Sequence, residues 1–314
     1  MFSCLSLCGG GSVFRFEREQ LVFDIGGVRV GGQPGENPTV VIGSIFYKGD
    51  KVVLDERSGK VDREAAEGLI RRFEEISDRT GLPCMLDVVC TNAENARRYL
   101  EFVVDVTKMP ILIDFTTDEA AISGMEVAKE LGVLDRVVLN SLTPETREVI
   151  FQKAKEVGIR AAIALTYSSR AIISYRERIR ILDTLIPKIK SAGIDKILVD
   201  TCVLDIATLG LACRAIYEVK RRYGYPCGCG AHNAVASWKQ LLEKKNKILT
   251  VACTAIANGL PIAIGADFIL FGPVSDAEFI VPAIAVINAA YGQVLMEEGR
   301  RPRPDHPRFK ISRL

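Results

Sequence analysis

Eight short apolar runs, rich in β-branched residues, recur along the chain with longer amphipathic stretches between them. Such uninterrupted apolar runs are typical of strands covered on both faces, as in a parallel sheet whose strands are joined by crossover helices. Eight such strand–helix repeats with one unbroken spacing predict the α/β class and a (β/α)8 TIM barrel instead of an open sheet. No Gly/Ser/Pro-rich linker divides them, which predicts a single domain. The predicted strands cover residues 40–45, 85–89, 111–114, 137–140, 161–165, 196–200, 227–230 and 268–272.

The amphipathic stretches carry the residues that usually begin and end helices. Thr143-Pro144 offers an N-cap at the start of one stretch, and Gly81 and Gly158 stand where two others should stop. The predicted helices cover residues 63–80, 92–107, 118–132, 144–158, 174–192, 205–223, 234–246 and 278–298.

Two glycine-rich turns precede the first barrel strand. Gly26-Gly27 joins two short apolar runs and predicts an N-terminal β-hairpin, which we expect to close the N-terminal end of the barrel. The segment GGQPGENP (31–38) precedes a strand and lacks GK[ST], so we interpret it as a rigid turn instead of a Walker phosphate loop. Residues 1–13 lack the features of a signal peptide. We expect them to be a flexible extension or a mis-called start, with the barrel domain over residues 14–314.

Charge and cysteine content exclude several classes of protein. The chain has 41 basic and 39 acidic residues, which gives no strong positive field of the kind that supplies most affinity for nucleic acid. Nine cysteines without a repeated CxxC pair indicate buried thiols in a reducing cytosol, not a disulfide scaffold. Cys227 and Cys229 have only His232 nearby, so no four-ligand zinc site is expected.

Two long uncharged stretches lie near the C-terminus. Residues 248–266 and 279–296 are long enough to cross a bilayer, but prolines and polar residues interrupt both. Neither stretch is flanked by the aromatic residues expected at a membrane interface. We interpret both as buried helices, and their lack of charge favours a homodimer interface.

Polar residues stand at the ends of the predicted strands, where the functional groups of this fold lie. A single strand-end Asp often only caps the next helix, whereas a set around one rim indicates a binding site. Two of the clearest positions are amides, which are poor sole ligands for a hard cation, so no metal ion is expected. Carboxylates mixed with amides suit an uncharged heterocycle that offers both donors and acceptors. Glycines after strands seven and eight would permit a phosphate site, yet no Lys or Arg follows them closely. The candidates are Asp87, Asp114, Asn140, Asp200, His232 and Asn233.

Several strings of the sequence resemble one known family. They are residues 14–51 (FRFEREQ to FYKGDK), LDVV (86–89), VVLNS (137–141), LVDT (198–201) and GCGAHNAVASWK (228–239). Together they are similar to the H subunit of tetrahydromethanopterin S-methyltransferase, although the strand-end motifs alone occur throughout the pterin-binding barrels. The resemblance implies transfer of the methyl group of methyl-tetrahydromethanopterin to the cob(I)amide of a partner corrinoid subunit. That step belongs to a complex of methanogenesis and one-carbon metabolism that methylates coenzyme M and exports sodium.

The resemblance also implies roles for the candidate residues. Asn233 is expected to be the catalytic hydrogen-bonding group at the methyl-bearing nitrogen, while Asp114, Asn140 and Asp200 bind the pyrimidine edge and Asp87 supports them. A tertiary amine is a poor leaving group, so the protein must position the pterin and stabilise developing charge. The chain itself would bind no cofactor, because the partner supplies the cobamide. It would be cytoplasmic and associated with the membrane only through the complex.

Three other functions are compatible with the same residues. One is a methyl-tetrahydrofolate:corrinoid methyltransferase with a different corrinoid partner. Another is a different barrel enzyme, such as a phosphate-binding aldolase or a pteroate synthase, and the third is a non-catalytic scaffold protein of the complex. His232 is either a general acid, since histidine titrates near neutral pH, or a side chain that points out of its loop.

Overall fold

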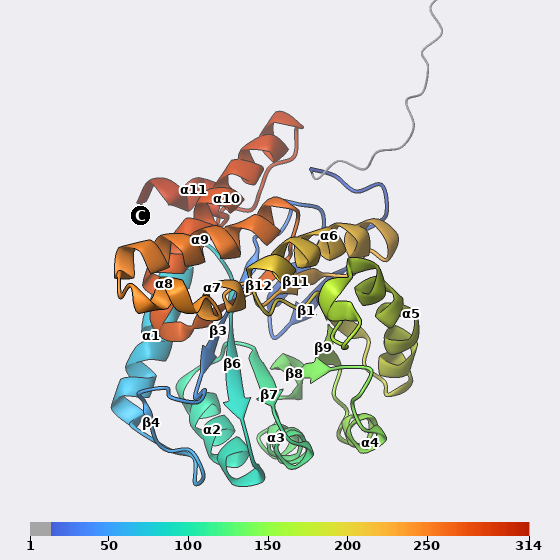
Figure 1. Cartoon of the computed structure of the whole chain (residues 1–314), viewed down its shortest axis with the longest axis vertical. Coiled ribbons are helices and arrows are strands. Elements are labelled where there is room, and N and C mark those ends of the chain that lie inside the picture. Colours follow the sequence, from blue (N-terminus) through green and yellow to red (C-terminus); the bar gives the residue numbers. More distant parts are fainter. Residues whose placement is uncertain (1–13, 314) are drawn as a thin grey trace, which may run out of the picture.

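The computed structural model describes residues 14–313, so the segment 1–13 lies outside the described residues. Eight parallel strands form a closed barrel in chain order, and pairing of the last strand with the first closes it (Figure 1). The predicted (β/α)8 barrel is therefore confirmed. Its strands are β3 (Val40–Ile45), β6 (Cys84–Cys90), β7 (Ile111–Phe115), β8 (Val137–Leu142), β9 (Ala161–Leu165), β10 (Lys196–Asp200), β11 (Cys227–Cys229) and β12 (Phe268–Pro273).

Helices surround the barrel and begin near the C-terminal ends of the strands. Side-chain caps fix several starts: Asn92 and Asp205 form capping boxes, and Ser174 accepts a hydrogen bond from the Glu177 amide. The helices are α1 (Arg63–Thr80), α2 (Ala93–Val106), α3 (Asp118–Glu130), α4 (Glu148–Val157), α5 (Tyr175–Ser191), α6 (Ile206–Arg222), α7 (Asn233–Ala236), α8 (Lys239–Glu243), α9 (Lys247–Ala263), α10 (Ala277–Glu297) and α11 (Pro307–Lys310).

Two predicted helices differ from the structure. The helix expected over residues 234–246 is wrong: the chain forms the short helices α7 and α8, which break at Ser237 and Trp238. Residues 239–246 have only Leu241 buried, so no apolar face holds a longer helix against the barrel. The helix expected from residue 144 begins only at Glu148, because Thr143 and Thr146 bond to each other in a turn.

The hairpin before the barrel closes its N-terminal end, as predicted. Strands β1 (Val22–Ile25) and β2 (Val28–Gly31) pair antiparallel around the turn at Gly26 and Gly27. Ile25 and Val30 are fully buried and belong to the same core cluster as the inward-facing residues of the barrel. A separate, larger core lies between the barrel and its helices. A further small hairpin, β4 (Val53–Asp55) with β5 (Lys60–Val61), follows β3.

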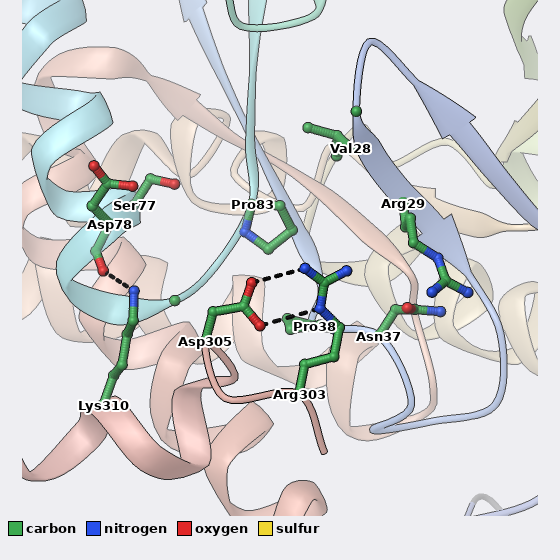
Figure 2. Close-up of a pocket in the computed structure, with 12 residues that line it drawn as sticks. Val28, Arg29, Asn37, Pro38, Ser77, Asp78, Pro83, Arg303, Asp305 and Lys310 are labelled. Atoms are coloured by element: carbon green, nitrogen blue, oxygen red, sulfur yellow. Dashed lines mark hydrogen bonds and ion pairs between the residues drawn. The ribbon is translucent and has the colours of Figure 1, made fainter. Parts of the chain in front are cut away.

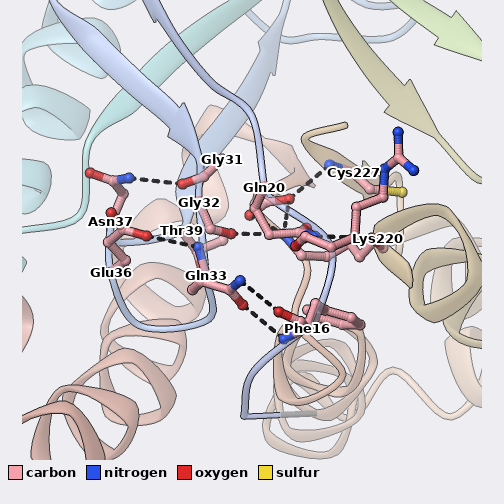
Figure 3. Close-up of polar contacts among 12 residues, drawn as sticks. Phe16, Gln20, Gly31, Gly32, Gln33, Glu36, Asn37, Thr39, Lys220 and Cys227 are labelled. Carbon is pink, nitrogen blue, oxygen red and sulfur yellow. Dashed lines mark hydrogen bonds and ion pairs between the residues drawn. The ribbon is translucent and has the colours of Figure 1, made fainter. Parts of the chain in front are cut away.

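Polar contacts fasten the N-terminal segment to the barrel (Figure 3). The Gln33 side chain bonds both the N–H and the carbonyl of Phe16, and Asn37 donates to the Gly31 carbonyl, so residues 31–38 form the rigid turn that was predicted. The fully buried Lys220 ammonium donates to the Asp267 carboxylate at 2.7 Å and to the Gly32 carbonyl. These contacts satisfy a charge that would be very unfavourable if it were buried alone.

Helices α9 and α10 correspond to the two uncharged stretches. Within the described residues, only Val274–Glu297 is both long and apolar enough to cross a membrane, a criterion that core helices of soluble proteins also meet. The inner face of α10 packs on the protein, with Ile280 and Ile284 buried. The prediction that these helices are buried holds for one face only, because Ile256 and Val286 are exposed on the other.

Candidate functional site

A cavity of about 710 Å³ opens among the C-terminal ends of the barrel strands. The elements of the barrel bring all of the predicted polar residues to this one place. The cavity is lined by Asp87 of β6, Asp114 of β7, Asn140 of β8, Asp200 of β10, and His232 and Asn233 before and at the start of α7. Because the strands are parallel, their carboxyl ends share one rim, which is why residues far apart in the sequence converge here.

Asp87 is the most enclosed carboxylate of the cavity, at 2% exposed. Ser44 Oγ donates to one of its oxygens at 2.7 Å and Asn140 Nδ2 to the other at 2.9 Å. The bond from Asn140 fixes the orientation of that amide, since a carboxylate can only accept, and leaves its carbonyl oxygen available to a ligand. Asp87 therefore positions Asn140, and burial raises the pKa of Asp87 to about 6.

Asp114 stands beside Asp87 on the next strand. The pKa of Asp114 is raised well above its usual value by burial and by the negative charge of Asp87. Two neighbouring carboxyl groups in an enclosed site resist carrying two charges, so one of the pair holds a proton more readily than a free aspartic acid does. The pair can thus offer a donor as well as acceptors to a bound heterocycle.

Asp200 accepts a hydrogen bond from the backbone that follows it, and a buried arginine holds that part of the backbone in place. Its Oδ1 accepts from the Cys202 amide at 2.7 Å, and burial raises its pKa to about 6. Arg178 of α5, only 1% exposed, donates to the carbonyls of Thr201 and Cys202 at 2.8 and 2.9 Å. It also donates to two carbonyls of the loop after β9, at Ala171 and Ile172. One guanidinium therefore ties together two loops of the rim, and its charge lowers the pKa of Asp200 against the effect of burial.

Asn233 and His232 lie side by side after β11, but the structure holds them differently. Asn233 Nδ2 donates to the Val203 carbonyl at 3.1 Å, so the loop after β10 also orients this amide. His232 Nδ1 lies 3.0 Å from the Leu270 carbonyl and therefore carries the ring proton. Burial lowers the pKa of His232, which keeps the ring neutral near pH 7 and leaves Nε2 as an acceptor. The interpretation that His232 points out of its loop is wrong, and a neutral ring whose proton is already bound is a poor general acid.

Gly272, near the end of β12, allows the close approach of the His232 ring. A Cβ at this position would lie 3.2 Å from His232 Cγ, and its φ of +108° is unfavourable for other residues.

Several side chains of the cavity were not predicted from the sequence. Ser44 is the next-to-last residue of β3, a polar residue near a strand end like the predicted ones, so the same rule could have found it. Tyr47, Tyr167 and Cys202 lie in loops beyond the strands, where an apolar run gives no signal.

A second cavity, of about 230 Å³, lies at the opposite end of the barrel (Figure 2). Two of its basic groups are already engaged by the protein: Arg303 pairs with Asp305, and Lys310 donates to the Asp78 carbonyl. Among residues 14–313, no three His, Cys, Asp or Glu side chains are grouped so that they could hold a metal ion, and Cys227 and Cys229 are buried thiols in β11. The cavity at the C-terminal ends of the strands is therefore the candidate site.

Comparison with solved structures identifies the class of barrel. The chain is similar to dihydropteroate synthase of Xanthomonas albilineans, with a TM-score of 0.60 and 17% identity over 88% of this chain and 98% of that one. It is also similar to the Coxiella burnetii dihydropteroate synthase in complex with pteroic acid, with a TM-score of 0.58 and 14% identity over 86% and 98% of the two chains. At this identity the likeness shows the fold alone, which is the closed barrel of the dihydropteroate synthases.

Sequence comparison places the chain in one family within this fold. Residues 18–302 match the family model of the tetrahydromethanopterin S-methyltransferase MtrH subunit. The H subunit of that enzyme from Methanothermobacter thermautotrophicus is 37% identical over 95% of this chain and 100% of its own length, and the corresponding protein from Methanocaldococcus jannaschii is 34% identical over 95% and 100%. The chain belongs to the MtrH family of tetrahydromethanopterin S-methyltransferase subunits. The predicted family and methyltransferase class are thereby confirmed.

Proposed function

We propose that this chain binds a methyl-tetrahydropterin in the cavity and transfers its methyl group to the cob(I)amide of a partner corrinoid subunit. The preferred substrate is methyl-tetrahydromethanopterin, within the complex that methylates coenzyme M and exports sodium. The observation that carries the proposal is the convergence of three carboxyl and two amide side chains on one cavity in a member of this family. The chain would sit at the membrane only through that complex.

Most of the polar side chains in the cavity bind the pterin ring, and one assists the reaction. Asp200 accepts paired N–H groups of the pyrimidine edge, and the free carbonyl oxygen of Asn140 accepts another. Asp114 completes this edge, and Asp87 keeps Asn140 in place. These contacts orient the methyl-bearing nitrogen toward the open mouth of the barrel.

Asn233 acts at the bond that breaks. The partner's cob(I)amide supplies the nucleophile, so the chain itself needs no activating base. As the N–CH₃ bond breaks, the methyl group passes to cobalt, the ring nitrogen keeps the electron pair, and solvent at the open mouth supplies the proton that this nitrogen takes up. A hydrogen bond from Asn233, whose amide the Val203 carbonyl holds in position, stabilises that nitrogen most in the transition state.

Methyl transfer to free cob(I)alamin tests the proposal directly. The purified chain is mixed with methyl-tetrahydromethanopterin and cob(I)alamin, and the absorbance of methylcobalamin is followed. We expect its formation to depend on the chain. Turnover with methyl-tetrahydrofolate at equal or higher kcat/KM would favour the alternative substrate and partner, and no turnover with either pterin would favour a non-catalytic scaffold.

Acid is expected to weaken pterin binding through Asp200. With a pKa of about 6, this carboxylate is charged at pH 7.5 and largely protonated at pH 5.5, where it loses acceptor capacity. The charged groups that face it are Arg178 of α5, which lowers this pKa, and Asp87 of β6, which raises it. Calorimetric titration at the two pH values should give a Kd roughly four-fold higher at pH 5.5 from this group.

The control for the acid effect is Asp200→Asn, which cannot ionise. Its binding should be weaker at pH 7.5 and less dependent on pH than that of the wild type. Equal pH dependence in the two proteins would contradict the role of Asp200. The same group makes the opposite contribution to folding: because its pKa is raised from 3.8 to about 6 in the folded state, the free energy of unfolding falls as the pH rises between these values, and the loss persists above pH 6.

We also propose that a second copy of the chain covers the outer faces of α9 and α10. These faces expose Ile256, Leu260 and Val286. No charged residue interrupts 248–266 or 279–296, so two copies can meet there without repulsion. Ile256→Lys should convert a dimer to monomers in light scattering, whereas Leu54→Lys, at another exposed apolar residue, should not. A monomeric wild type, or a dimer unaffected by Ile256→Lys, would contradict this interface.

A further inference from the structure

A groove lies beside the candidate site, between the first turns of α9 and α10. It has a volume of about 480 Å³, and Lys245, Lys247, Thr250, Ser275 and Phe279 are among its lining residues. The Lys247 ammonium lies 4.7 Å from the centre of the Phe279 ring. Because helices in this barrel begin at the C-terminal ends of the strands, the groove opens at the same end of the molecule as the cavity.

The groove and the cavity share a wall. Tyr47 and His232 line the cavity, while Ser275 and Asp276 line the groove. The Tyr47 hydroxyl contacts Ser275, and the Asp276 carboxyl group lies close to the His232 ring. The groove therefore lies directly beside the cavity, because Pro273 lines the cavity while Ser275, two residues farther along the chain, lines the groove.

The two spaces carry opposite charge. The described residues that line the cavity include three aspartates and neither lysine nor arginine. The groove has two exposed lysines and a single carboxylate, Asp276, whose pKa is raised by burial. An anionic group is thus repelled from the cavity and attracted to the groove, whereas an uncharged heterocycle is suited to the cavity.

We propose that the groove binds the anionic end of the pterin substrate's tail, a carboxylate or a phosphate, through Lys245 and Lys247. The proposal rests on the proposed function of the cavity. A phosphate site was not expected from the sequence, because no basic residue closely follows the glycines after strands seven and eight. The structure supplies the basic residues from farther along the chain, between α8 and the start of α9.

The test compares pterins with and without an anionic tail. The double variant Lys245→Gln/Lys247→Gln and the wild type are titrated with methyl-tetrahydromethanopterin, methyl-tetrahydrofolate and 5,6-dimethyl-tetrahydropterin, which has no tail. We expect the variant to bind the two tailed pterins about ten-fold more weakly and the tailless pterin within about two-fold of wild type. Raising the salt concentration should reduce wild-type affinity for the tailed pterins more than variant affinity.

The matched control is Lys239→Gln/Lys244→Gln, which removes two lysines from the neighbouring α8 region that do not line the groove. It should bind all three pterins like the wild type. Unchanged binding of both tailed pterins by the groove variant, or an equal loss for the tailless pterin, would overturn the proposal. A loss confined to one tailed pterin would support it and identify the anionic group that is recognised. Failure of the wild type to bind any pterin would instead contradict the proposed function of the cavity.

Discussion

Asn233→Ala is expected to slow methyl transfer far more than it weakens substrate binding. The hydrogen bond from the Asn233 side chain to the leaving nitrogen strengthens as the N–CH₃ bond breaks. Its loss therefore raises the activation barrier by about 1–3 kcal/mol, which lowers kcat roughly 5- to 150-fold. Single-turnover kinetics with methyl-tetrahydromethanopterin and cob(I)alamin would separate this effect from binding. Asp200→Ala should show the opposite pattern, with most of its cost in the Kd of the pterin.

Asn37→Ala is the matched control for Asn233→Ala. Both side chains donate an amide hydrogen bond to a backbone carbonyl, Asn37 to Gly31 and Asn233 to Val203, but Asn37 lies at the opposite end of the barrel. The two variants should lose similar stability, and only Asn233→Ala should lose activity. If Asn233→Ala and Asp200→Ala both kept wild-type kinetics, the assignment of this site would be wrong.

Replacing Arg178 should alter both the stability of the protein and the pH dependence of pterin binding. Arg178→Met leaves four buried carbonyls without their donor, which should reduce the free energy of unfolding by about 3 kcal/mol or more. It also removes the positive charge that lowers the pKa of Asp200, so that pKa should rise. The acidic midpoint of pterin binding should therefore move to higher pH.

Arg178→Lys separates the charge from the geometry. Lysine keeps the positive charge but cannot span both loops, so we expect weaker binding with an acidic midpoint close to that of the wild type. This variant also keeps the prediction testable if Arg178→Met fails to fold. A role limited to holding the fold would leave the midpoint unchanged in every folded variant. An unshifted midpoint in Arg178→Met, or a Lys variant that binds like the wild type, would contradict a positioning role for Arg178.

The six polar candidates could be found from the sequence because the rule that locates them is local. A strand in this barrel is a short apolar run, and a polar residue toward its C-terminal end, or just after it, lies near the functional rim. The same rule fails at the neighbouring loops. Nothing near Tyr47 or Arg178 in the sequence indicates that one lines the cavity and the other lies beneath the loops of its rim.

The stretch after β11 shows a second limit of prediction from sequence. Its polar residues have strong enough helix propensity to predict one helix over 234–246, yet the chain breaks at Ser237 and Trp238. Propensity is a weak preference, and an apolar face against the barrel normally decides whether a crossover helix persists. In this part of the chain the longer helix is α9, which buries Ala257 and Ile262, instead of one helix over 234–246.

By itself, the sequence determined the alternation of eight strands with helices, the hairpin that closes one end of the barrel, and the polar residues at the strand ends. Each of these follows from periodicity and turn chemistry within a few neighbouring residues. Only the tertiary structure decided that Asp87 fixes Asn140, that burial beside β12 keeps His232 neutral, and that lysines beyond α8 lie beside an acidic cavity. Those features depend on distances and burial between residues far apart in the chain, and no local pattern encodes them.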